Sequence, residues 1–315
     1  MTRVVRIGVG SGSPEGANSA YLLPDEGVVV DPGPPDEEAW EALRDGVREV
    51  VPSLGAVDHV VVTHWHVDHA GLAPRLAAAA DATVHMHATD APFVASYERA
   101  REERLDRDAG ALRRWGVPTE VVERVVAGDT PSSLPAETAV EAHDDGDRVA
   151  GGRLLHTPGH TAGHAAVAFD GHLFVGDAIL PTYTPNVGGS DTRLTNPLEA
   201  YLTSLARLER RLDGVDVHPG HGERLDLPDR LDHIRTHHER RTARVSSRLA
   251  DRGRATPWDV AGDLFGDLSG IHVKFGAGEA AAHLEYLRAH DYAVESGDEP
   301  VTYEHRRRYE GPSED

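Results

Sequence analysis

The chain has 315 residues, enough for one large or two moderate domains, and its 53 acidic residues face 32 Lys and Arg residues, for a formal net charge of −21. It contains no cysteine, which excludes disulfides and thiolate metal ligands. No apolar run is long enough to span a bilayer and no signal-like apolar segment follows Met1, so we expect a cytoplasmic protein that stays out of membranes.

The charge has a further implication, because Lys274 is the single lysine of the chain. An acidic excess with Arg in place of Lys resembles proteins adapted to high salt, where ions screen self-repulsion. A GC-rich genome would also explain the lysine deficit, but explains the charge less well. We therefore expect a halophilic protein, and this surface opposes the binding of nucleic acid.

The N-terminal third predicts strands joined by short turns. A strand over 4–9 enters a glycine-rich turn over 10–16, which lacks the signature of a phosphate loop. The runs 21–23 and 28–30 predict a hairpin, and residues 36–51 predict a surface helix.

Polar side chains gather directly after the apolar run 60–62. His64, His66, Asp68 and His69 fall within six residues, before a helix expected over 72–80. Imidazole and carboxylate together suit Zn, Fe or Mn better than a hard cation that takes oxygen ligands alone. We interpret this stretch as a metal site.

Ligand-type residues also follow three later strand-like runs, among glycines that let the backbone approach closely. His160 and His164 follow the run 153–157, Asp177 follows 172–175, and His221 follows 215–218. This layout predicts one site assembled from several strands.

The motifs HxHxDH, TPGHTxGH, GD and GHG, in this order, resemble those of the metallo-β-lactamase superfamily over roughly residues 4–223. The resemblance implies an α/β fold, the αββα sandwich, with a dinuclear metal centre at one edge. It implies that His64, His66 and His160 hold the first ion. Asp68, His69 and His221 would hold the second, and Asp177 would bridge the two.

The same resemblance assigns supporting roles. Asp31, which follows the strand 28–30, would orient a ligand histidine, and His164 would act from outside the ligand set. Asp68 and Asp177 are the expected catalytic carboxylates. Asp68 would relay a proton to the leaving group, and Asp177 would set the spacing of the ions.

Substrate contacts are expected from aromatic and polar residues near these motifs. Residues 90–126, with a charged helix over 97–115, predict either a lid that places Trp115 near the metal edge or a solvated structural helix. Trp65 lies within the first motif, and Tyr183 and Asn186 lie in the loop 181–195 that follows Asp177. Phe93 and Tyr97 are further candidates. His85 and His87, in a strand over 83–87, are interpreted as mainly structural.

The composition changes after residue 222. Helices are expected over 227–250, 256–265 and 277–290, followed by strands over 292–294 and 301–303 that turn across 296–298. This order resembles a winged-helix module, and similar helical additions occur in glyoxalase-II-like hydrolases and in lactamase-like endoribonucleases. We thus expect a catalytic domain over 1–225, a small C-terminal domain over 226–310 and a frayed tail over 311–315.

The expected function is hydrolysis of a small thioester, ester or lactone by a hydroxide held between two divalent ions, zinc first and iron or manganese as alternatives. An RNA-cleaving endonuclease is the main alternative. Arg240, Arg244 and Arg248, at helical spacing, would serve it, although ion pairing with the acidic surface is the simpler account. A non-enzymatic metal-stabilised binding or regulatory protein and a mononuclear iron persulfide dioxygenase remain as further alternatives. The expected partner is a small-molecule substrate; the oligomeric state stays open, with a homodimer compatible.

Overall fold

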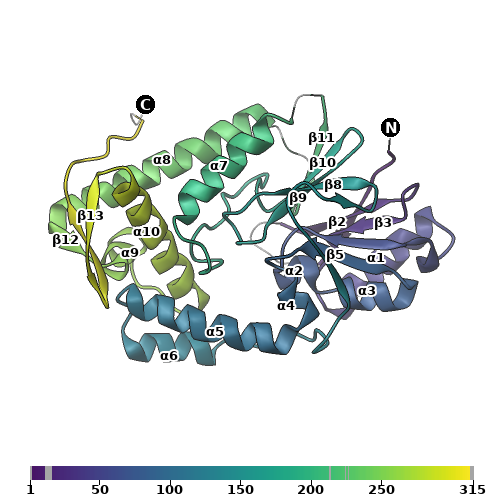
Figure 1. Ribbon diagram of the computed structural model, residues 1–315, viewed down its shortest axis with the longest axis horizontal. Coiled ribbons are helices and arrows are strands. Elements are labelled where there is room, and N and C mark those ends of the chain that lie inside the picture. Colours follow the sequence, from purple (N-terminus) through teal and green to yellow (C-terminus); the bar gives the residue numbers. More distant parts are fainter. Residues whose placement is uncertain (1, 11–15, 213, 224, 226, 313–315) are drawn as a thin grey trace. The chain divides into compact units, whose positions relative to one another are not determined.

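The computed structural model describes residues 2–10, 16–212, 214–223, 225 and 227–312, and the chain forms two compact units (Figure 1). Unit 1 comprises residues 1–101, 131–185 and 204–227, and unit 2 comprises residues 102–130, 186–203 and 228–315. The segment expected to form a lid contributes residues to both units. The domain boundary expected after residue 225 stays a prediction, and most of the expected turn over 10–16 lies outside the described residues.

The described part of unit 1 contains a six-stranded sheet in the order β1-β2-β3-β4-β5-β6. Its strands are β1 (Val5–Val9), β2 (Asn18–Leu23), β3 (Val28–Val30), β4 (His59–Val62), β5 (Thr83–His87) and β6 (Val140–His143). Pairing is antiparallel from β1 to β3 and parallel from β3 to β6. The carboxyl ends of β3, β4 and β5 therefore lie at one edge of the sheet, where loops build sites.

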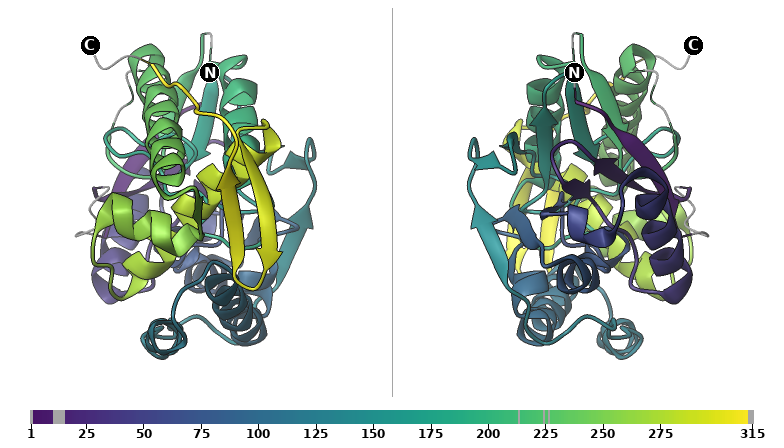
Figure 2. Two further views of the ribbon diagram at one scale, coloured as in Figure 1. Left: turned by 90° about the vertical axis from the view of Figure 1, so that its left-hand side faces the viewer. Right: turned by 90° about the vertical axis from the view of Figure 1, so that its right-hand side faces the viewer.

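Helices α1 (Glu37–Val50) and α3 (Ala73–Ala80) cover one face of this sheet (Figure 2, right). The Asp36 carboxylate caps α1 by accepting a 2.8 Å hydrogen bond from the Ala39 amide. Apolar residues of α1 recur at helical spacing and pack against the strands, which removes them from water. The cluster includes Trp40, Leu43, Val47, Val60, Val62, Leu76, Val84 and Met86.

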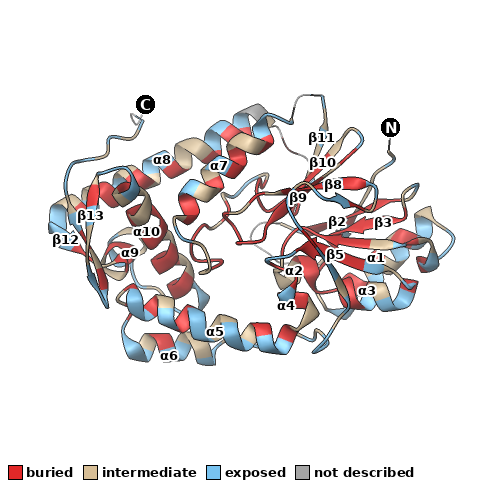
Figure 3. Ribbon diagram, viewed as in Figure 1, coloured by how far each residue is buried: buried red, intermediate tan, exposed pale blue. Residues whose placement is uncertain are grey.

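The second sheet of unit 1 has five strands in the order β11-β10-β9-β8-β7 among the described residues. These are β7 (Arg148–Val149), β8 (Gly152–His156), β9 (Ala165–Phe169), β10 (His172–Gly176) and β11 (Asp216–Pro219). Buried residues, red in Figure 3, recur along the strands of both sheets. Apolar side chains of both sheets share one buried cluster: Leu23, Val28, Val30, Val61, Leu154, Val167 and Phe174. The sheets therefore pack face to face, and the α/β sandwich expected from the sequence is confirmed.

Helix α7 (Pro197–Glu209) lies with its C-terminal part against the chain that follows β8. There the Ser204 hydroxyl donates to the Pro158 carbonyl at 2.8 Å, and Arg207 donates to the His156 carbonyl at 2.9 Å. These bonds help to hold the loop that carries His160.

Unit 2 is mainly helical, and a small sheet in the order β12-β14-β13 accompanies its helices (Figure 2, left). Its elements are most of α5 (Tyr97–Arg114), then α6 (Thr119–Ala127), α8 (Leu227–Arg252), β12 (Arg254–Ala255), α9 (Pro257–Phe265), α10 (Ile271–Ala289), β13 (Ala293–Asp298) and β14 (Val301–His305). They enclose an apolar cluster that includes Leu112, Trp115, Val260, Leu284 and Tyr303. The helical C-terminal region is confirmed, whereas its likeness to a winged helix stays a prediction. No described helix is both long enough and apolar enough to cross a membrane.

Three details differ from the sequence-based expectations. Helix α10 begins at Ile271 rather than Ala277 and includes Gly278, where a Cβ atom would lie 2.4 Å from the Gly189 Cα atom. Strand β13 continues to Asp298, so the chain reverses at residues 299–300 instead of 296–298. Helix α6 had no clear pattern in the sequence.

Candidate metal centre

The side chains expected to hold metal lie together in unit 1. They are carried by the loops and short helix α2 (Val67–Ala70) that follow β4, and by the loops that follow β8, β10 and β11. These strand ends meet at one edge of the two sheets. The residues are His64, His66, Asp68, His69, His160, Asp177 and His221.

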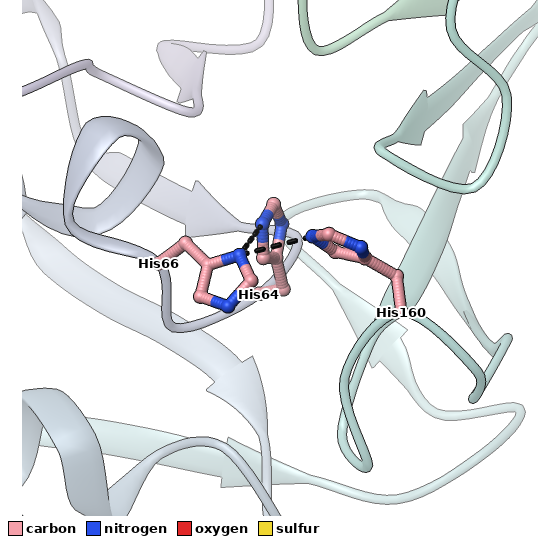
Figure 4. Close-up of side chains that lie close together, drawn as sticks. All are labelled: His64, His66 and His160. Carbon is pink, nitrogen blue, oxygen red and sulfur yellow. Dashed lines mark hydrogen bonds between the residues drawn. The ribbon is translucent and has the colours of Figure 1, made fainter. Parts of the chain in front are cut away.

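The first group consists of three imidazoles that point toward one another (Figure 4). His66 Nδ1 lies 3.1 Å from His64 Nε2 and 3.0 Å from His160 Nε2. His64 is fully buried and His160 nearly so. Three imidazole nitrogens at this spacing are a set of donor atoms that suits zinc or a similar ion.

The second group combines two imidazoles with a carboxylate. His69 Nε2 lies 3.2 Å from His221 Nε2, and Asp68 Oδ2 lies 3.5 Å from the former and 3.3 Å from the latter. The side chain of Asp68 is 42% exposed, whereas both histidines are buried. This group therefore faces solvent through its carboxylate.

Asp177 stands between the two groups. Its Oδ2 atom lies 3.7 Å from His160 Nε2 and 3.5 Å from His221 Nε2, and its Oδ1 atom lies 3.3 Å from His69 Nε2. A Cβ atom on Gly220 would lie 2.4 Å from Oδ1, so a glycine is needed at this position. One carboxylate thus reaches both groups.

Asp31 and Thr63 orient two of these imidazoles through contacts with their Nδ1 atoms. Asp31 accepts from the Thr63 amide at 2.8 Å and hydroxyl at 2.7 Å, and its Oδ2 atom lies 3.1 Å from His69 Nδ1. The Thr63 hydroxyl, already donating to Asp31, accepts from His64 Nδ1 at 3.1 Å. Both histidines then turn an Nε2 lone pair toward the cluster.

His164 acts on the backbone of Asp177 instead of joining the donor set. Its Nε2 atom accepts from the Asp177 amide at 3.2 Å, and its Nδ1 atom lies 2.8 Å from the Thr157 hydroxyl. Full burial lowers the pKa of His164 well below its usual value, so the ring is neutral and can accept this bond.

Two residues that sequence reasoning missed support the same loops. Asp90 is fully buried and accepts from the Thr161 hydroxyl at 2.7 Å, the Gly163 amide at 2.9 Å and the Trp65 amide at 3.3 Å. It ties the loop of the first motif to the loop that carries His160. Asn18 donates to Asp68 Oδ2 at 3.0 Å. Asp90 lies just after β5, and this position at the end of a strand is the feature of the sequence that could have indicated its role in the site.

The pKa values of the histidines shift in opposite directions in the two groups. Burial, reinforced by neighbouring imidazoles, lowers the pKa of His66 to about 3 and that of His64 well below its usual value. Burial alone would raise the pKa of the Asp177 carboxyl, yet His69 and His221 bring it well below its usual range. Against the effect of burial, hydrogen bonds to Asp177 and Asp68 raise the pKa of His221 to about 10. The carboxylates thus hold positive charge on the second group, and a cation would supply the same charge.

The residues present fit such cations. Asp177 Oδ1 is buried and accepts no hydrogen bond of good geometry from the described residues. Metal binding requires ionised carboxylates and neutral imidazoles, so an ion at the second group would take the place of the protons on His69 and His221. The orphaned oxygen and the convergent nitrogens together indicate sites for divalent ions.

The expected substrate contacts lie in different surroundings. Trp65 stacks on Phe93 with ring centroids 4.4 Å apart and meets His66 edge-on at 4.6 Å. Tyr183 is 50% exposed in unit 1. In unit 2, Trp115 is buried in the apolar cluster, and Asn186 Oδ1 accepts from the amides of residues 189 and 190. Their role as substrate contacts stays a prediction.

Comparisons with known proteins agree with this geometry. A family model described as the metallo-beta-lactamase superfamily matches residues 13–221. The probable metallo-hydrolase YqjP of Bacillus subtilis is 26% identical over 285 residues, which are 86% of this chain and 88% of that protein. A hydroxyacylglutathione hydrolase of Anaeromyxobacter dehalogenans is 31% identical over 208 residues, 65% of this chain and 61% of its own. The crystal structure of the metallo-beta-lactamase family protein TTHA1429 from Thermus thermophilus aligns with a TM-score of 0.74 at 30% identity, covering 96% of this chain and 98% of that one.

Proposed function

The chain belongs to the metallo-beta-lactamase superfamily, and we propose that this metallo-hydrolase is dinuclear and acts on a small thioester or a related ester or lactone. The observation that carries the proposal is the position of Asp177. Its two oxygens face both groups of donor atoms, and one of them has no hydrogen-bond donor among the described residues. A carboxylate in this place suits two neighbouring cations.

We propose zinc as the metal, because the first group is all imidazole and the second adds one carboxylate. Iron and manganese are the alternatives that this donor set allows. Bound divalent ions would supply an acidified water as nucleophile and would polarise the bond under attack. A single iron, as in the persulfide dioxygenase alternative, would leave one of the two groups without an ion, and metal analysis separates the two cases.

Asp68 is the proposed proton carrier. Its side chain is the most open of the two carboxylates, with 42% exposure against 8% for Asp177. His69 and His221 overcome the effect of burial and hold the pKa of Asp68 below its usual range, so it is ionised at neutral pH and able to accept a proton. The Asn18 amide fixes one of its oxygens at 3.0 Å. Asp68 can therefore take a proton at the cluster and release it to the leaving group or to solvent.

The preference for an acyl substrate rests on two considerations. The hydroxyacylglutathione hydrolase of A. dehalogenans acts, by its name, on an acylated thiol, and it is 31% identical over the matched residues. The net charge of −21 opposes the binding of a polyanion. Both favour a small acyl substrate over RNA.

The test is a panel of thioesters, esters, lactones and RNA, assayed together with metal content on the wild type and on an Asp177→Ala variant. We expect turnover on at least one acyl substrate and its loss in the variant together with metal. Hydrolysis that survives in Asp177→Ala at full metal occupancy would remove the dinuclear mechanism. A wild type that binds metal but cleaves nothing in the panel would favour the non-enzymatic alternative.

One observation favours the RNA-cleaving alternative. A hollow of about 250 Å³ on α8 is lined by basic and polar residues: His233, Thr236, His237, Arg240, Arg241 and Arg244. Arg241 is already paired with Glu279. Arg248, the third residue of the expected stripe, instead lies 3.7 Å from Asp251. A variant with Ser at positions 240 and 244 should leave acyl turnover within a few-fold of wild type. If this double variant loses an RNA-cleaving activity that Arg248→Ser retains, the RNA-cleaving endonuclease becomes the favoured function.

A further inference from the structure

A second histidine cluster lies in the six-stranded sheet of unit 1 and shares no residue with the centre described above. Val84 and Met86 of β5 pack in the cluster beneath α1 and α3, so His85 points to the opposite face of the sheet. Parallel pairing sets His85 beside Glu141 of β6, and His143 follows two residues later on the same face. His59 of β4 completes the row. Sequence reasoning interpreted His85 as structural.

The donor atoms of three of these side chains converge. His85 Nδ1 lies 3.0 Å from His143 Nε2, and the Glu141 carboxylate reaches both, at 3.7 Å from each of these nitrogens. His85 and His143 are buried, whereas the Glu141 side chain is 59% exposed and leaves the group open to solvent. We propose that His85, Glu141 and His143 form a separate binding site for one zinc-type divalent cation.

The spacing supports the proposal. Bonds of about 2.05 Å at tetrahedral angles place the ligand atoms of zinc about 3.3 Å apart. The two imidazole nitrogens, 3.0 Å apart, lie near that value, and the Glu141 carboxylate places Oε2 at 3.7 Å from His85 Nδ1 and Oε1 at 3.7 Å from His143 Nε2. One ligand atom from each of the three residues can be chosen so that all lie within 4.8 Å of one another. The group of His64, His66 and His160 shows the same feature, because His66 Nδ1 and His160 Nε2 are also 3.0 Å apart. Two imidazoles and a carboxylate are a common donor set for zinc, with a water in the fourth place.

His59 supplies the outer contact that a ligand histidine needs. His85 Nε2 lies 3.0 Å from His59 Nδ1, so a proton on His85 Nε2 can be donated to His59 and leaves His85 Nδ1 free to bind the cation. Without a cation, the proton of His85 can sit on either nitrogen, because both contacts join pairs of ring nitrogens. A cation bound at Nδ1 would fix the proton on Nε2.

A cation at this site would hold the edge strand β6 against its neighbour β5. β6 is the last strand of its sheet and has four residues, and residues 88–139 separate it from β5. A cation held by His85 on β5 and by Glu141 and His143 on β6 would join the two strands directly. Because it binds the folded chain only, it would raise the thermal stability of unit 1.

The test uses Zn²⁺ as the probe and the full chain, stripped of metal and then titrated, with stoichiometry measured by calorimetry and by elemental analysis. We expect Glu141→Gln and His143→Asn to bind about one equivalent fewer than the wild type, since a metal site without a ligand loses most of its affinity. His87→Gln, on the same strand and face but stacked on His156, is the matched control and should bind as the wild type does. The expected difference of one equivalent between wild type and variants is the same whether the other centre binds one ion or two.

Equal stoichiometry in the wild type and in both variants would overturn the proposal. Glu141 is exposed and Gln has the same shape, so this variant should fold, and circular dichroism checks that it does. A second measurement needs no variant. Zn²⁺ should shift the ¹⁵N resonance of His85 Nδ1 and leave its proton on Nε2; a proton that stays on Nδ1 in saturating Zn²⁺ would also reject the site.

Discussion

Asp177 in unit 1 and Asp108 in unit 2 are both buried carboxylates, but their surroundings differ. Asp108 accepts from Lys274 Nζ at 2.7 Å, from Arg104 at 3.2 Å and from the Thr192 hydroxyl at 2.7 Å, so permanent cations and a hydroxyl satisfy both of its oxygens. Asp177 is surrounded by imidazoles, and its Oδ1 atom accepts no hydrogen bond from the described residues. One carboxylate is neutralised by its own chain, whereas the other keeps a place for a cation.

The difference shows how a structural charge is told from a functional one. A carboxylate paired with fixed cations contributes to stability, and removing one partner leaves an uncompensated charge. A carboxylate facing imidazoles can be balanced by protons on those rings or by a metal ion bound in their place. The two sites should therefore respond in opposite ways to matched substitutions.

The largest effect is expected from Asp177→Asn, which keeps the shape of the side chain and removes its charge. Metal occupancy should fall, and turnover should drop by more than about a hundred-fold, beyond the range for residues outside the ligand set. The melting temperature of the metal-free protein should change little. Elemental analysis, kinetics and calorimetry measure these three quantities, and normal turnover at full occupancy would contradict the assignment.

Lys274→Met should show the opposite pattern. It leaves the buried Asp108 with Arg104 as its remaining cation, so the free energy of unfolding should fall by about 3 kcal/mol, while the metal content stays unchanged. Denaturant unfolding measures the loss. Adding Asp108→Asn removes the unpaired charge and should restore part of it; a double variant no more stable than the single one would argue against the ion pair as the cause.

Asp31→Asn tests the orientation of the ligands. Asp31 holds His69 Nδ1 at 3.1 Å and Thr63 at 2.7 Å, so its loss should weaken metal binding by about ten-fold without removing a ligand. Competition with a chelator of known affinity gives the change. A variant with unaltered affinity and lower turnover would instead place Asp31 in the reaction itself.

Acid should destabilise unit 2 through His238, a buried residue with neither a metal group nor a counter-ion among the residues that the structure describes. Burial lowers the pKa of His238 to about 3, while an unfolded histidine titrates near about 6.5. The unfolded chain therefore binds an extra proton between these values, so stability is full above about pH 6.5 and falls as the pH drops toward 3. His238→Leu should flatten this fall in melting curves, and the exposed His272→Gln should not.

The smallest and most uniform effect is expected from salt. The Debye length grows from about 3 Å at 1 M to about 10 Å at 0.1 M, so repulsion within a chain of net charge −21 increases on dilution. The melting temperature should fall as KCl is removed, by the same amount in the wild type, Asp177→Asn and Lys274→Met, because both carboxylates are buried. A flat or rising melting temperature would remove the halophilic interpretation.

Local patterns were enough to predict much of the fold and the expected metal-binding residues. The apolar runs before His64, Asp177 and His221 predicted strands that deliver side chains to one site, and the resemblance to the metallo-β-lactamase superfamily implied how these side chains group. Neighbouring residues carry this information, because alternation and glycine positions constrain the backbone locally. Thr256 and Pro257 likewise predicted the start of α9, where the capping box is present.

Other features depended on contacts between distant segments. Asp90 has no motif, and its role appears only when the loops of Trp65 and Gly163 meet around it. His85 and Glu141 are far apart in the chain and become neighbours through the parallel register of β5 and β6. That register is set by the packing of both sheet faces, which the whole chain decides. The sequence therefore identified the residues of the expected metal centre, whereas only the tertiary structure decided what Asp90, His85 and Glu141 meet.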